Sequence, residues 1–174
     1  MSYNPSRRSF LKLSTAAAAA SSAKLVCAAS GAGRIAIHTD NSALVNTEPV
    51  QYAQGMLRDA ITAAHLTDDH SAAALHIQVA PADSLLAKAF AASSSVTQAE
   101  TVALIPGTHM GKPAVLVTGV DARGIVYGLL ELADRVRSSS NSISALRLAE
   151  PLIETTPNKV RGVSRGFCSE VEDK

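Results

Sequence analysis

Histidines and acids gather in one short stretch of the chain, and residues of these types can bind a transition metal. His65 and His70 flank an Asp-Asp pair, and imidazole nitrogens and carboxylate oxygens are common ligands of Zn²⁺. A spacing of five residues, however, does not place the two histidines on one face of a helix. His38 and His76 fall inside predicted strands, where we expect packed or edge residues. The sequence therefore predicts no metal site and no cofactor.

A glycine-containing turn between a predicted strand and a predicted helix is a second place where chemistry could occur, because helix N-termini attract phosphate groups. This turn spans residues 118–124 (TGVDARG). It has neither the G-x-G-x-x-G spacing of dinucleotide-binding turns nor the lysine of a P-loop. Nucleotide binding is therefore not predicted.

The elements that must position these residues follow from hydrophobic periodicity. Alternating or continuous apolar runs predict strands, and apolar residues at helical spacing predict helices. The predicted strands are 34–39, 74–80, 102–105 and 114–118, and the predicted helices are one that starts near Pro49, a short one at 83–92 and one at 122–136. Residues 106–111 are predicted to be a turn, and so short a connection makes its two strands antiparallel neighbours. The sequence thus predicts an α+β fold, a mixed β-sheet with two or more helices packed on it.

The N-terminal segment, residues 1–30, has the layout of a twin-arginine signal peptide. Its address consists of a consecutive arginine pair followed closely by an apolar pair and a lysine; the residues are Arg7, Arg8, Phe10, Leu11 and Lys12. A short run rich in Ala, Ser and Thr follows, which is too short and too weakly apolar for a permanent membrane span. We therefore expect export by the twin-arginine machinery to the periplasm or the outside of the cell.

The composition limits the possible partners. The formal net charge is only +1, and nucleic-acid binding normally requires a basic excess or a basic stripe, so no nucleic-acid partner is predicted. The chain has three Phe, three Tyr and no Trp. Sugar-binding clefts commonly use flat aromatic faces, and this shortage argues against a self-contained sugar site.

One stretch resembles a known family of domains. Residues 115–132 (VLVTGVDARGIVYGLLEL) consist of a predicted strand, a turn carrying Asp121, an Arg-Gly pair and a Tyr-Gly pair within the next helix. This order resembles the N-terminal domain that precedes the catalytic barrel in bacterial β-N-acetylhexosaminidases of glycoside hydrolase family 20 and in α-glucuronidases. The order of elements from Arg34 to Val136 is similar to that domain as well.

The resemblance implies a division of the chain and a function. Residues 31–157 would be a non-catalytic α+β domain, and residues 158–174 would begin a (β/α)8 barrel that the chain does not complete. The domain would support that downstream barrel, which would act on a carbohydrate substrate. Glycoside hydrolysis requires suitably placed carboxyl groups, and these families carry them on barrel strands, so no catalytic residue is predicted within this chain.

The resemblance carries one residue over as a candidate for substrate binding. Arg161 matches the arginine of the family's Arg-Gly pair at the first barrel strand, which often holds sugar hydroxyls. The family's acid a few residues later is not matched, because Gly166 stands about where it should be. The alternative to an enzyme domain is a stand-alone exported α+β module that binds a partner or ligand without catalysis.

Overall fold

The computed structural model describes residues 33–155. The predicted export-signal residues and the predicted sugar-binding residue lie outside them; these are Arg7, Arg8, Phe10, Leu11, Lys12 and Arg161. The described residues form the strands β1 (Arg34–Thr39), β2 (Thr67–Asp68), β3 (Leu75–Pro81), β4 (Thr101–His109), β5 (Lys112–Gly119) and β6 (Leu152–Thr155). The helices are α2 (Glu48–Ala63), α3 (Leu85–Lys88), α4 (Ala122–Ser138) and α5 (Ser142–Leu146), with a 3-10 turn, η2, at Ser93–Ser95.

The six strands form one mixed sheet in the order β2-β1-β3-β5-β4-β6. The first four strands in this order run parallel to one another. β4 runs antiparallel to both β5 and β6, so the predicted antiparallel pairing of β4 and β5 is confirmed. The predicted mixed sheet with helices packed on it is confirmed too.

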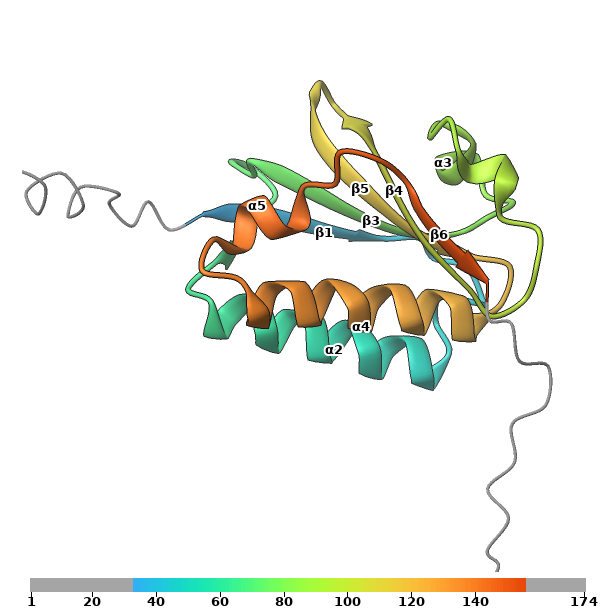
Figure 1. Ribbon diagram of the computed structural model, residues 1–174, viewed down its shortest axis with the longest axis horizontal. Coiled ribbons are helices and arrows are strands. Elements are labelled where there is room, and N and C mark those ends of the chain that lie inside the picture. Colours follow the sequence, from blue (N-terminus) through green and yellow to red (C-terminus); the bar gives the residue numbers. More distant parts are fainter. Residues whose placement is uncertain (1–32, 156–174) are drawn as a thin grey trace, which may run out of the picture. The chain divides into compact units, whose positions relative to one another are not determined.

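Helices α2 and α4 lie side by side against one face of the sheet (Figure 1). Pro49 occupies the first turn of α2, where its missing N–H costs nothing. Ala53, Leu57 and Ile61 then recur at helical spacing and are buried, which confirms the apolar stripe expected from the sequence. No helix among residues 33–155 is long and apolar enough to cross a membrane.

The first turn of α4 is held by one carboxylate. Oδ1 of Asp121 accepts a hydrogen bond from the backbone N–H of Gly124 at 3.0 Å and another from the backbone N–H of Glu100 at 3.1 Å. The first bond is an N-cap, which satisfies a backbone donor that the helix itself leaves free. The second ties the start of α4 to the residue preceding β4. One acid therefore fixes where α4 begins and how it meets the sheet.

A smaller apolar cluster covers part of the opposite face of the sheet. It joins Phe90 to small and aliphatic side chains of the strands, including Ile105 and Leu116. The predicted helix at 83–92 is wrong in extent, because α3 ends at Lys88. The chain turns there so that the ring of Phe90, 4% exposed, can pack on the sheet. Gly107 accepts that ring, since an added Cβ would lie 2.6 Å from its Cδ1 atom.

The turn predicted at residues 106–111 is also wrong. Pro106 and His109 belong to β4, and only Met110 and Gly111 connect it to β5. A proline is tolerated inside this strand because β6 pairs with β4 only at residues 101–104. Beyond that point β4 is an edge strand, and the missing N–H of Pro106 breaks no second ladder.

Candidate metal centre

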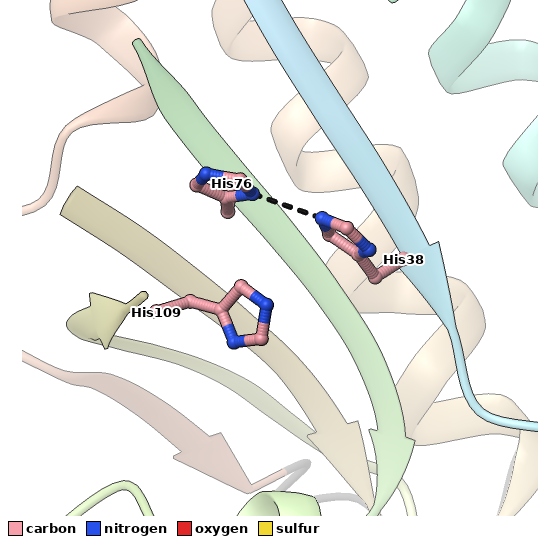
Figure 2. A group of neighbouring side chains, drawn as sticks. All are labelled: His38, His76 and His109. Carbon is pink, nitrogen blue, oxygen red and sulfur yellow. Dashed lines mark hydrogen bonds between the residues drawn. The ribbon is translucent and has the colours of Figure 1, made fainter. Parts of the chain in front are cut away.

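Three histidines from three strands converge on the face of the sheet opposite α2 and α4. They are His38 of β1, His76 of β3 and His109 of β4, and each offers a ring nitrogen within 4.8 Å of those of the other two. Figure 2 shows their imidazoles pointing toward one another above the strands. His38 and His76 are the two histidines predicted from the sequence to lie in strands, and His109 falls in the segment predicted to be a turn.

The strand register explains why the rings can meet. His76 lies beside Ala36 of β1 and Ala114 of β5, and Ala114 in turn pairs with Gly107 of β4. This row across the sheet therefore carries side chains no larger than a methyl group around His76. Side chains on one face of a strand recur every second residue, so His38 follows Ala36 and His109 follows Gly107 on this face. The small residues leave room for the larger rings to lean over them.

Two of the imidazoles are joined directly. Nε2 of His38 and Nδ1 of His76 are 2.9 Å apart, a hydrogen-bond distance. Such a bond needs a lone pair on one of the nitrogens, so at least one of the two rings is neutral. The ring of His109 lies 5.1 Å from that of His38 and 5.2 Å from that of His76, between ring centres.

The cluster is surrounded by charged and titratable groups. His70 meets the ring of His38 edge-on with 4.6 Å between ring centres. Oδ1 of Asp68 lies 3.7 Å from Nε2 of His70 and accepts a hydrogen bond from the backbone N–H of Ile37. On the other side, Nζ of Lys112 donates to the backbone carbonyl of Ala73 at 2.9 Å.

This environment favours the neutral form of both linked histidines. Burial lowers the pKa of His38, the positive charges of neighbouring histidines lower it further, and Asp68 opposes them. Burial also lowers the pKa of His76, with further lowering by His109, Lys112 and His70. Neutral imidazole is the form that binds metals, so the two rings keep a ligating form at lower pH than an exposed histidine does.

The metal-free protein is expected to lose stability when the pH falls below 6.5, the ordinary pKa of histidine. Because both pKa values are lower in the folded state, the unfolded chain takes up more protons between those values and 6.5. The contribution of the two neutral histidines to the free energy of unfolding is therefore complete above pH 6.5. It decreases as the pH falls from 6.5 through their lowered pKa values in the folded state. Urea unfolding with a chelator present, measured between pH 8 and pH 5, checks this. The double variant His38→Gln/His76→Gln should show a flatter profile, and an equal slope in both proteins would contradict it.

The other residues discussed from the sequence have different roles or stay apart. His65 is not part of the histidine cluster. In the turn before α4, Asp121 accepts hydrogen bonds from two backbone N–H groups of the protein itself. A groove of about 340 Å³ beside α4 is lined by several acids. Two of these pair with arginines of the same helix, Glu131 with Arg135 and Asp134 with Arg137.

Comparisons with known proteins identify no family for this chain. No protein-family model matches it, and no curated protein matches it. Among solved structures, it is similar to part of a glycoside hydrolase family 138 enzyme that targets the pectin rhamnogalacturonan II, with a TM-score of 0.45 and 18% sequence identity. The match covers 70% of this chain and 15% of that enzyme. That enzyme belongs to a different glycoside hydrolase family from the two whose N-terminal domain the sequence motif resembles.

Proposed function

We propose that residues 33–155 are an accessory, non-catalytic domain of an exported glycoside hydrolase, and that they support a catalytic barrel downstream. The observation that carries the proposal is the motif at residues 115–132, which resembles the pre-barrel domain of family 20 hexosaminidases and α-glucuronidases. In the fold it spans the strand β5, the turn at Asp121 and the first part of α4. This is the order of elements that the resemblance implies.

The roles of the motif residues support a structural purpose. Asp121 caps α4. A Cβ on Gly124 would lie 2.5 Å from the backbone oxygen of Thr101, and one on Gly128 would lie 2.8 Å from a methyl group of Val117. These glycines let the helix lie close to the sheet. Asp121, Gly124 and Gly128 thus build the contact between helix and sheet.

The acidic groove beside α4 supports the same assignment. A glycosidase needs an acid to protonate the leaving group and a second group to act as base or nucleophile. Glu131 and Asp134 are each engaged by an arginine within one helical turn. Such pairs join these two carboxylates to arginines of the same helix.

The remaining parts of the proposal concern the ends of the chain. Export rests on the twin-arginine pattern at Arg7 and Arg8, and it would deliver a folded protein to the periplasm or the outside of the cell. Arg161 would hold sugar hydroxyls at the start of the barrel. The alternative, a stand-alone binding module, would share the export signal and the fold but would have no barrel to support.

An activity assay of two polypeptides tests the proposal. The chain of 174 residues should not hydrolyse 4-nitrophenyl N-acetylhexosaminides, glucuronides or pectic oligosaccharides, whereas the polypeptide that includes its downstream coding sequence should hydrolyse one of these classes. In that longer protein, Arg161→Ala should raise KM about tenfold, roughly the loss of one hydrogen bond to a charged group. Arg58→Ala, on the exposed side of α2, is the matched control and should leave KM unchanged.

Two outcomes would overturn the proposal. Turnover by the 174-residue chain would show that this segment is catalytic. A natural polypeptide without a downstream barrel would favour the stand-alone module instead.

A further inference from the structure

We propose that His38, His76 and His109 bind one divalent transition-metal ion, each through one ring nitrogen, and that water completes the coordination. Imidazole nitrogens suit Zn²⁺, Cu²⁺ and Ni²⁺, and Zn²⁺ commonly takes three protein ligands plus a water molecule. The inference is independent of the proposed glycoside hydrolase role, because it uses residues on the sheet face opposite α4.

The distances between the nitrogens are close to those that a metal requires. Nitrogens bound to one zinc ion at about 2.0–2.1 Å can be no more than about 4.2 Å apart. The three candidate nitrogens already lie within 4.8 Å of one another, so small rotations about the side-chain bonds bring them into range. The nitrogens of His38 and His76 already face each other at 2.9 Å, and on metal binding the shared proton would move to the other nitrogen of its own ring.

The backbone holds the ligands in place before any ion arrives. β1 is paired with β3, β3 with β5 and β5 with β4, so all three histidines stand on hydrogen-bonded strands of one sheet. Sites on strands are positioned more precisely than sites on loops, and little ordering is needed on binding. His76 is 3% exposed, whereas His38 and His109 are half-buried. The ion therefore has a route from solvent to the buried ligand.

The cluster is costly for the metal-free fold, which argues against a purely structural role for the rings. Buried polar groups in proteins are normally hydrogen-bonded. Nε2 of His76 is buried without a partner among the described residues, and its other ring nitrogen contacts only a second histidine. Residues that only filled this space would be better as apolar side chains. A bound cation would replace the contact between the two imidazoles, because it gives the facing nitrogens of His38 and His76 a common partner together with His109.

Zinc binding to the full chain tests the site. After treatment with a chelator and dialysis, titration calorimetry at pH 7.5 should show one Zn²⁺ per chain, and saturating Zn²⁺ should raise Tm. Losing an outer-shell partner of a metal ligand already costs about 10–100-fold in affinity. We therefore expect His38→Ala, His76→Ala and His109→Gln each to weaken binding by at least about 100-fold.

The controls separate this site from other ligands and from unfolding. His65→Asn changes an exposed histidine outside the cluster at a residue with φ of +57°, a conformation that asparagine tolerates, and it should bind zinc as the unaltered protein does. Alkylation of Cys27 and Cys168 should leave the titration unchanged. Circular dichroism establishes whether each variant is folded. Because His109 is only half-buried, His109→Gln should have little effect on the fold. The proposal would be overturned if the chain did not bind zinc or if folded His109→Gln still bound it. It would also be overturned if alkylation of the cysteines abolished binding.

Discussion

Replacing Gly124 by alanine should lower the free energy of unfolding by about 2–3 kcal/mol, the usual cost of overpacking a tight contact. The new Cβ would lie 2.5 Å from the backbone oxygen of Thr101 and 3.2 Å from the carboxylate of Asp121. The first atom is backbone in a paired strand and cannot move aside cheaply. The gain of about 1 kcal/mol from alanine's better helix propensity is too small to offset the clash. Urea unfolding followed by circular dichroism measures the loss.

A second glycine provides the matched control. Gly55 also lies inside a helix, α2, but an added Cβ there meets nothing within 4 Å. Gly55→Ala should therefore raise the free energy of unfolding by about 0.5–1 kcal/mol, the helix-propensity gain alone. If both alanines stabilise the protein to the same extent, α4 does not approach β4 as closely as described.

Replacing Leu129 by alanine should cost about 2–5 kcal/mol of the free energy of unfolding. Leu129 is fully buried between α4 and the sheet, so the substitution removes apolar contacts and leaves a cavity. Leu85 of α3 is 86% exposed, and Leu85→Ala should change stability by no more than about 0.5 kcal/mol. The midpoint of thermal unfolding distinguishes the two variants, and similar small losses would contradict the assignment of the main core to the α4 side of the sheet.

Local patterns in the sequence were sufficient to predict the main elements of the fold. The apolar stripe of α2 and the acid that precedes α4 are short-range signals, since each depends on residues within a few turns of the same helix. The predicted strands at 34–39 and 74–80 agree closely with β1 and β3. Where the pairing of distant strands decides the outcome, the prediction was wrong. Pro106 reads as part of a turn, but it lies in β4 because β6 leaves that half of the strand unpaired on one side.

The histidine cluster could not be predicted because it depends on that same strand. Treating residues 106–111 as a turn removed His109 from the sheet, although alternation from Gly107 places it on the face that also carries His38 and His76. Even with the correct strand, the convergence requires the order β1-β3-β5-β4. No spacing along the chain encodes that order. The small residues Ala36, Gly107 and Ala114 form one row only once that order is known.

The two-residue connection between β4 and β5 determines which side chains of β4 lie on the face of the sheet that carries the histidines. Met110 and Gly111 both have positive φ, 52° and 74°, as in the tightest hairpins, whose twist matches that of the strands. Loop length sets the phase of side-chain alternation, and a slip of one residue inverts every side chain of the strand. Inserting a single residue into this connection would shift the pairing of His109 with Lys112 by one residue and turn that imidazole to the other face of the sheet, among the helices. The position of His109 as the third ligand thus depends on the length of this connection as much as on the presence of a histidine.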